Sequence, residues 1–438
     1  MRPVWAEISK GRLVGNFEVL QAAVRRQAGE RAAVLAVVKA NAYGHGAVEC
    51  APLLAAAGAE WLGVTSVDEG LAVRAALAAS GLALQPKVLV MCGLWHGEAA
   101  AALEHALTPV VWEAFHLDLL EAEALRRGLG SQSVGVHLEI DTGMARQGVA
   151  PDERLQQLLG RLGPRSPLRL EGVLTHFASP EQVDAPQNAC QMAKFTEALR
   201  MVREAGLRPE WVHAGNSSSV DAGVSVGELG RLAASVGARA MARPGLALYG
   251  CSLPLVSIAG TPEAGQVHAA LQPVLAWKTR IVSCRDLAAG ETVGYNATFT
   301  ARLPMRLALL PVGYADGLRR ELSGGDGPAD RAAGAAGVDR AKDGNALLVR
   351  AGNAVLARAG GTVLVRGMRA PIVGRVSMDL TIVDVSGIEG AAIGDEVVIL
   401  GEQASERVTA EDHARLAGTI PYEILCGISD RVPRVVVA

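Results

Sequence analysis

The feature that most constrains the fold is a regular alternation of short apolar runs with longer amphipathic stretches between about residues 11 and 250. The runs have the length of buried strands, and the stretches between them carry apolar residues at helical spacing. Eight such strand–helix units predict an α/β protein with a (β/α)8 TIM barrel. A doubly wound sheet is the alternative, but no glycine fingerprint follows the first strand. The predicted strands are AVLAVVK, EWLGVTS, PKVLVM, LTPVVW, VGVHLEID, EGVLTHF, EWVHAG and the segment around MARPGLALYG.

From about residue 265 the pattern changes to short segments with period-two alternation, separated by Gly, Pro and Asp turns. This alternation predicts a mainly β domain. We therefore place the barrel at residues 9–262 and a C-terminal β domain at residues 263–438, which the strand-like residues 1–8 could join. Residues 323–345 are rich in Gly, Ala and Asp, so we expect a flexible surface insertion there without a catalytic role.

Composition and charge exclude several classes of function. A net charge of -3 gives no indication of a nucleic-acid partner. Six scattered cysteines without a CxxC pair favour a reduced, cytoplasmic protein over a disulfide or zinc framework, so we expect no metal. The N-terminal residues lack the pattern of a signal peptide, and no apolar stretch is long enough to span a bilayer.

Polar side chains follow the predicted barrel strands at their carboxyl ends, where TIM barrels place functional groups. Lys39 ends a buried strand and is followed by Tyr43 and two glycines. The ordinary interpretation is a strand-end lysine with its ammonium in water. A desolvated lysine, however, loses its proton more easily and can form a Schiff base with an aldehyde. The other strand-end residues are Glu139, Arg146, His176, Asn216, Ser217, Arg243 and Gly245.

These residue types together favour one cofactor. Asn216, Ser217 and the backbone amides near Gly245 suit a phosphate, which needs small donors and close backbone approach. A Schiff-base lysine, a phosphate cradle and an arginine for a pyridine nitrogen are what pyridoxal 5'-phosphate requires.

Several motifs resemble those of the alanine racemase family. VKANAYGHG is similar to the family's pyridoxal-phosphate attachment signature, and the resemblance continues through IDTGMARQG, LTHFA, HAGNSSS, ARPGLALYG, VGYNATF, PVGYADG, RAPIVGRVSMD and IPYEIL. It implies a barrel plus a β domain, paired head to tail as a homodimer with shared active sites. The activity it implies is two-base interconversion of L-alanine and D-alanine through a pyridoxal-phosphate aldimine, supplying D-alanine for cell-wall peptidoglycan.

The resemblance also implies roles for individual residues. Lys39 would carry the cofactor and act as the base on one face of the substrate, and Tyr295, reaching in from the partner subunit, would be the base on the other face. Arg146 would bind the cofactor's phenolic oxygen and the substrate carboxylate. Arg243 would face the pyridine nitrogen, which stays unprotonated because a guanidinium does not readily give up a proton. Further cofactor contacts are implied for Tyr43, His176, Asn216, Ser217, Gly245 and Tyr422, and substrate contacts for Met378 and Tyr314, which would guard the entrance.

The sequence departs from the family pattern at the insertion, at Asn296 and at Glu139. Glu139 stands where many members have a lysine that is carbamylated and orients the neighbouring arginine. A glutamate would accept two hydrogen bonds from Arg146 without needing bound carbon dioxide. The plainer interpretation is a strand-end glutamate in solvent.

Other functions are also compatible with these motifs. A racemase of broader specificity would also accept serine, because a hydrophobic pocket rejects an added hydroxyl only weakly. A non-catalytic pyridoxal-phosphate-binding protein on the same barrel would need neither the β domain nor Tyr295. A pyridoxal-phosphate decarboxylase should lack VGYNATF and RVSMD in these places.

Overall fold

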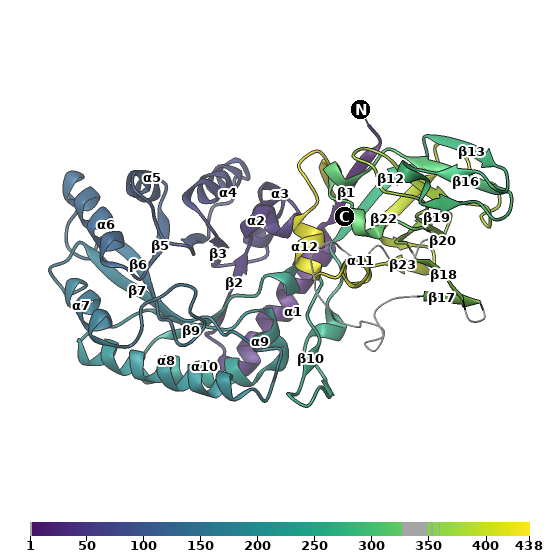
Figure 1. Ribbon diagram of the computed structural model, residues 1–438. Coiled ribbons are helices and arrows are strands. Elements are labelled where there is room, and N and C mark those ends of the chain that lie inside the picture. The colour runs from purple at the N-terminus through teal and green to yellow at the C-terminus, as the bar shows by residue number, and fades with distance from the viewer. Residues whose placement is uncertain (1, 326–347, 352–353, 359) are drawn as a thin grey trace. The chain divides into compact units, whose positions relative to one another are not determined.

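The computed structural model describes residues 2–325, 348–351, 354–358 and 360–438. The chain divides into two compact units. One unit is Lys10–Gln272, and the other combines the N-terminal residues through Ser9 with Pro273–Ala438 (Figure 1). The insertion predicted at 323–345 lies outside the described residues from position 326 onward.

The first unit is a closed barrel of parallel strands that follow one another in chain order (Figure 1). The pairing of β2 with β9, which aligns Ala33 with Met241, closes the barrel. This confirms the predicted (β/α)8 architecture. The barrel strands are β2 (Ala33–Val37), β3 (Trp61–Val64), β4 (Lys87–Val90), β5 (Leu107–Val111), β6 (Val134–Glu139), β7 (Leu168–Leu174), β8 (Trp211–His213) and β9 (Arg239–Ala242).

Helices alternate with these strands. Every residue of β2 and β3 is buried, as expected for a parallel barrel whose strands are covered on both faces. The helices bury one apolar face each, for example Leu155, Leu158 and Leu159 in α7. They are α1 (Lys10–Ala28), α2 (Lys39–Tyr43), α3 (Ala47–Ala56), α4 (Val67–Ala79), α5 (Glu98–Glu104), α6 (Ala114–Arg126), α7 (Glu153–Arg161), α8 (Pro186–Glu204), α9 (Ser217–Ala222) and α10 (Val224–Ser235).

The second unit is mainly β. Its largest sheet within the described residues runs β20-β19-β22-β12-β1-β24, with β23 paired to β22. The N-terminal strand β1 lies in this sheet, antiparallel to β12 and parallel to β24. The strands are β1 (Val4–Ser9), β12 (Leu275–Arg280), β19 (Thr362–Val365), β20 (Met368–Pro371), β22 (Glu396–Gln403), β23 (Glu406–Val408) and β24 (Arg434–Val437).

A smaller sheet, β13-β16-β21, packs an apolar cluster of its own. The cluster consists of Leu287, Val293, Ala301, Leu307 and Val373. The remaining elements of this unit are β13 (Ser283–Leu287), β14 (Thr292–Val293), β15 (Phe299–Thr300), β16 (Met305–Leu310), β17 (Leu348–Ala351), β18 (Ala354–Arg358), β21 (Thr381–Asp384), α11 (Ala410–Ala417) and α12 (Pro421–Cys426). None of the helices that the structure describes is both long and apolar enough to cross a membrane.

Candidate active site

Lys39 lies two residues after the end of β2, where the backbone begins to turn in the left-handed sense. Residues 40–43 are not glycine, yet all have φ angles between 51° and 54°. This conformation costs an L-residue roughly 1–2 kcal/mol, so neighbouring contacts must hold the turn. Asn41 provides one, because its side-chain oxygen accepts a hydrogen bond from the Ala47 amide at 2.8 Å. Backbone strain is therefore concentrated beside the lysine, as is common at functional sites.

Three of the predicted phosphate contacts, Tyr43, Ser217 and Gly245, lie together in the barrel unit. The Ser217 hydroxyl accepts hydrogen bonds from the amides of Gly245 and Ala247, each at 3.1 Å. A Cβ built on Gly245 would overlap the phenolic oxygen of Tyr43, so glycine is what lets the tyrosine approach this backbone. Asn216 caps α9, with its side-chain oxygen 3.1 Å from a backbone amide of the first turn.

Arg243, just after β9, is a buried cation among neutral partners. Its Nη2 donates to the carbonyl oxygen of Thr175 at 2.7 Å and lies 3.3 Å from Nδ1 of His176, while Nη1 lies 3.2 Å from Nδ1 of His213. Within the described residues no carboxylate forms an ion pair with it. Burial lowers the pKa of Arg243 to about 10, and burial with nearby positive charge lowers the pKa of His176 to about 3. At neutral pH the arginine is therefore charged and the histidine neutral.

Glu139, the last residue of β6, is buried and bonded to Gln147 instead of Arg146. The Gln147 amide donates to the Glu139 carboxylate and to the carbonyl oxygen of Met91, the latter at 2.9 Å. No hydrogen bond or ion pair joins Glu139 to Arg146 in the part of the chain that the structure describes. Burial raises the pKa of Glu139, against the lowering influence of Gln147 and of the positive charges of Arg243 and Arg146.

The turn after β6 explains why Glu139 contacts Gln147 and not Arg146. The Asp141 carboxylate accepts hydrogen bonds from the amides of residues 143–145, at 2.9 to 3.1 Å, and a backbone bridge then pairs Ile140 with Val149. This parallel bridge brings the chain back beside the end of β6. Gln147 lies on the side that faces the buried carboxylate, whereas its neighbour Arg146 is exposed.

In the second unit, Tyr295, Tyr314 and Met378 line one groove. All three side chains are exposed, and Tyr295 lies in a 3-10 turn instead of a strand. The Tyr314 amide donates to the carbonyl oxygen of Ser377, and the next amide donates to that of Met378, both at 3.0 Å. Tyr422 lies in α12 of the same unit and is not one of the residues that line this groove.

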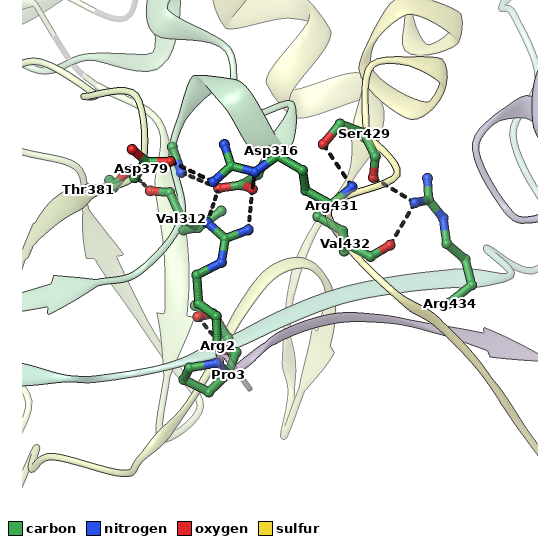
Figure 2. A network of polar contacts seen from close by, with 12 residues as sticks. Arg2, Pro3, Val312, Asp316, Asp379, Thr381, Ser429, Arg431, Val432 and Arg434 are labelled. Carbon is green, nitrogen blue, oxygen red and sulfur yellow. Dashed lines mark hydrogen bonds and ion pairs between the residues drawn. The ribbon is translucent and has the colours of Figure 1, made fainter.

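The turn Tyr314–Asp316 contains a buried carboxylate, that of Asp316, whose polar contacts are drawn in Figure 2. Asp316 is fully buried, and its carboxylate pairs with Arg2, including a hydrogen bond from Nη1 at 3.0 Å. The Nε of Arg431 lies 3.5 Å from the same carboxylate, which also accepts a hydrogen bond from the Gly313 amide at 3.0 Å. One acidic side chain thus has two arginine partners.

The network continues to the segment that carries Met378. Arg431 forms a second ion pair with Asp379 at 2.6 Å. Arg431 therefore links the turn of Tyr314 to the residue directly after Met378 (Figure 2).

The sequence interpretation missed several of these polar residues. In the barrel they are His137, His213 and Glu171, and in the second unit they are Arg2 and Asp316. A signal was present for the barrel residues, because each interrupts an apolar strand segment with a polar side chain.

The barrel residues fit the cofactor that the motifs imply. The Ser217 hydroxyl, the Tyr43 phenol and the backbone amides near Gly245 lie together at this point, and hydroxyl and amide donors suit a phosphate. Arg243 offers hydrogen-bond donors and no acceptor, which suits an unprotonated ring nitrogen. Lys39 is partly exposed at the end of β2 in the same unit.

A parallel barrel with a lysine and a cluster of hydroxyls and backbone amides at its strand ends, together with a β-rich unit, defines the class as a two-domain barrel enzyme. The family model described as "Alanine racemase, N-terminal domain" matches residues 8–253. The model "Alanine racemase, C-terminal domain" matches residues 274–334 and 348–436, and so omits 335–347, most of which lies in the predicted insertion.

Individual relatives agree over nearly the full length. An alanine racemase of Syntrophobacter fumaroxidans is 36% identical over 426 residues, covering 97% of this chain and 95% of its own. The structure of alanine racemase from Streptomyces coelicolor A3(2) has a TM-score of 0.78 at 31% identity, covering 99% of this chain and 98% of its own. A Bartonella henselae alanine racemase structure with covalently bound pyridoxal phosphate has a TM-score of 0.73 at 25% identity, covering 100% of both chains. The chain therefore belongs to the alanine racemase family, which confirms the family predicted from its motifs.

Proposed function

We propose that the protein interconverts L-alanine and D-alanine with pyridoxal 5'-phosphate as its cofactor, and supplies D-alanine for cell-wall peptidoglycan. The observation that carries the proposal is the cradle of Tyr43, Ser217 and Gly245 in the same barrel unit as Lys39 and the buried Arg243. When bound, the cofactor spreads into its ring the negative charge left when an amino acid loses its α-proton.

Lys39 would hold the cofactor covalently and then serve as the base on one face of the substrate. A lysine amine accepts a proton only in its neutral form, which a desolvated site favours. The left-handed turn at residues 40–43 fixes the backbone directly after Lys39, which limits where the amine can reach.

Tyr295 would be the base on the opposite face, contributed by the partner subunit of a head-to-tail homodimer. A tyrosine has an unperturbed pKa of about 10, so it needs donors that stabilise the phenolate. His176 can supply one. Because Arg243 can only donate, Nδ1 of the neutral His176 accepts, and the single ring proton therefore lies on Nε2.

Arg243 and Arg146 would have different roles. Arg243 cannot readily give a proton to the ring nitrogen, which disfavours side reactions such as transamination. Arg146 would bind the cofactor's phenolic oxygen and the substrate carboxylate. It makes no hydrogen bond or ion pair within the described residues, so its donors remain available for that carboxylate. Met378 and Tyr314 would meet the substrate at the groove, and Tyr422 the phosphate.

Chemical labelling tests the cofactor assignment. We expect the protein with pyridoxal phosphate to racemise L-alanine, measured by chiral chromatography. Borohydride reduction followed by peptide mapping should then find the label on Lys39. A label on another lysine, or no label, would contradict the assignment. A panel that includes L-serine separates an alanine racemase from one of broader specificity, and no racemisation of any amino acid would favour the non-catalytic alternative.

Mixed dimers test whether the two bases come from different subunits. Lys39→Ala and Tyr295→Phe chains should each be inactive alone, because each lacks one base. Dissociating and reassociating the two together should restore part of the activity in heterodimers that hold one intact site. If heterodimers form, as shown by mass spectrometry of differently tagged chains, and no activity returns, each chain carries both of its bases.

A further inference from the structure

Three buried polar side chains continue from Arg243 into the barrel interior. Nη1 of Arg243 is 3.2 Å from Nδ1 of His213, and Nε2 of His213 is 2.7 Å from Nδ1 of His137. Nε2 of His137 then lies 4.0 Å from Oε2 of Glu171. Each of these three side chains is at most 2% exposed. The function proposed above uses none of them.

Arg243 fixes the direction of this chain of contacts. A guanidinium carries only donors, so Nδ1 of His213 must accept. Burial lowers the pKa of His137 to about 3 and that of His213 well below its ordinary value, so both rings are neutral and carry one ring proton. The proton of His213 is therefore on Nε2, which donates to Nδ1 of His137. The proton of His137 is in turn on Nε2, directed at Glu171.

The step from His137 to Glu171 is longer than a hydrogen bond, so it is an electrostatic contact. The carboxylate is nevertheless ionised. Burial opposes its charge, but hydrogen bonds from Lys87 and Arg169 and the positive charges nearby leave the pKa of Glu171 below its ordinary value. The contacts thus run from a buried cation through two neutral rings to a buried anion.

A bulge in β7 places Glu171 in this line. Val136 of β6 pairs with Leu170, but the next residue, His137, pairs with Gly172. Glu171 is therefore an extra residue on β7. Bulges of this kind redirect a side chain and are common beside active sites.

Two glycines make room for the same side chains. A Cβ built on Gly172 would lie 2.5 Å from Nδ1 of His137, and one built on Gly135 would lie 2.5 Å from Oε2 of Glu171. Trp61 packs on the same histidine, with ring centroids 4.9 Å apart. The side chains of Glu171, His137 and His213 are therefore accommodated by the packing of the barrel.

We propose that Glu171, His137 and His213 form a directed relay that positions Arg243. The inference rests on the proposed function, because Arg243 is the residue assigned to the cofactor's ring nitrogen. The relay gives the guanidinium an acceptor of fixed tautomer, His213, whose other ring nitrogen is held in turn by His137. The plane of the guanidinium is thereby set without a carboxylate that would occupy its donors. The three residues are positioning residues, since none of them is assigned a contact with substrate or cofactor.

Histidine tautomers provide a readout that does not depend on turnover. In protein carrying 15N-labelled histidine, with cofactor bound, long-range 1H–15N spectra distinguish protonated from unprotonated ring nitrogens. We expect His137 and His213 to be neutral between pH 6 and pH 9, with the proton on Nε2 in both. The chain has nine histidines, so the signals are assigned from single histidine variants. A proton on Nδ1 of His213, or titration of either ring in this range, would overturn the relay.

Glu171→Gln tests the end of the relay that lies farthest from Arg243, because glutamine keeps the shape of the side chain and removes its charge. We expect both tautomers to persist, because Arg243 sets them from the opposite end through His213. We expect kcat for racemisation to fall on the order of 10-fold through misplacement of Arg243, with KM for alanine changed less than about twofold, because other residues bind the substrate carboxylate. The matched control is Arg169→Gln. Arg169 lies 3.0 Å from the same carboxylate but outside the relay, so both tautomers and kcat should stay near wild type.

The outcomes separate this inference from the proposed function. Wild-type tautomers as expected without racemisation would refute the function and leave the relay standing. Racemisation with unchanged kcat in Glu171→Gln would refute the relay alone. Equal losses in Glu171→Gln and Arg169→Gln would show that the carboxylate serves only its surface ion pairs. If Glu171→Gln does not fold, as judged by circular dichroism, the histidine tautomers of the wild-type protein still test whether the relay exists.

Discussion

Replacing Asp316 with asparagine should loosen the groove of the second unit. The wild-type carboxylate is fully buried and pairs with Arg2 and Arg431, and it also accepts a hydrogen bond from the Gly313 amide at 3.0 Å. Asparagine has nearly the same size and can still accept from Gly313. It removes the negative charge, however, and its amide donors meet guanidinium donors. The substitution therefore isolates the charge from the packing.

The magnitude follows from the exposure of the partners. Removing one member of a fully buried ion pair costs about 3–5 kcal/mol, because it leaves an uncompensated charge in the interior. Here the arginine side chains are 29% and 46% exposed, so they regain water when Asp316 is neutralised. We therefore expect the low end, about 3 kcal/mol, which corresponds to a roughly 100-fold change in the opening equilibrium.

Hydrogen exchange of the Tyr314 amide measures this change directly. That amide donates to the carbonyl oxygen of Ser377, and its exchange rate reports local opening of the turn. We expect exchange to become roughly 100-fold faster in Asp316→Asn. The control is Asp379→Asn, which removes the 52% exposed partner of Arg431 and should cost at most about 1 kcal/mol. If the two variants exchange alike, desolvation cancels the attraction of the buried pair and the reasoning is refuted.

Two further predictions concern the barrel unit. Gly245→Ala should weaken cofactor binding roughly 10-fold or more, as measured by absorbance titration, because the new Cβ displaces the Tyr43 phenol. The control is Gly160→Ala, where a Cβ meets no atom within 4 Å. Equal cofactor binding by both variants would contradict the assignment of Tyr43, Ser217 and Gly245 to the phosphate. Glu139→Ala should lower turnover of L-alanine, because it removes the buried acceptor of the Gln147 amide, and wild-type activity should not depend on bicarbonate. Full activity of Glu139→Ala would show that the bond to Gln147 has no role in catalysis.

The barrel could be predicted because its signal is periodic and repeated. Parallel strands covered on both faces are mostly apolar, and AVLAVVK and EWLGVTS contain β2 and β3. Once the strands are placed, the carboxyl-end rule gathers side chains that are far apart in sequence. Ser217 and Gly245, for example, are 28 positions apart and joined by a hydrogen bond of 3.1 Å. Neither step needs a side-chain rotamer.

The finer geometry could not be predicted, because it depends on differences of a single position along the chain, such as which of two neighbouring side chains reaches a partner. Residues 40–43 adopt a left-handed turn without glycine, against the local preference of every residue in it. Gln147 and Arg146 are neighbours, and only the path of the turn decides which of them reaches Glu139. The bulge at Glu171 likewise shifts β7 by one residue. Such features are fixed by tertiary contacts, which the periodicity of a sequence does not report.

The two units bury an ionised side chain in opposite ways: Asp316 has two arginine partners, whereas Arg243 forms no ion pair with any carboxylate that the structure describes. Asp316 sits between two arginines, an arrangement that fixes a turn and consumes the acceptors of the carboxylate. A carboxylate placed on Arg243 in the same way would consume its donors and would strengthen its hold on its proton. Neutral acceptors hold Arg243 more weakly, and its pKa falls to about 10, yet it remains charged at neutral pH. In the proposed relay, the neutral rings of His213 and His137 orient the cation while sparing donors for a ring nitrogen.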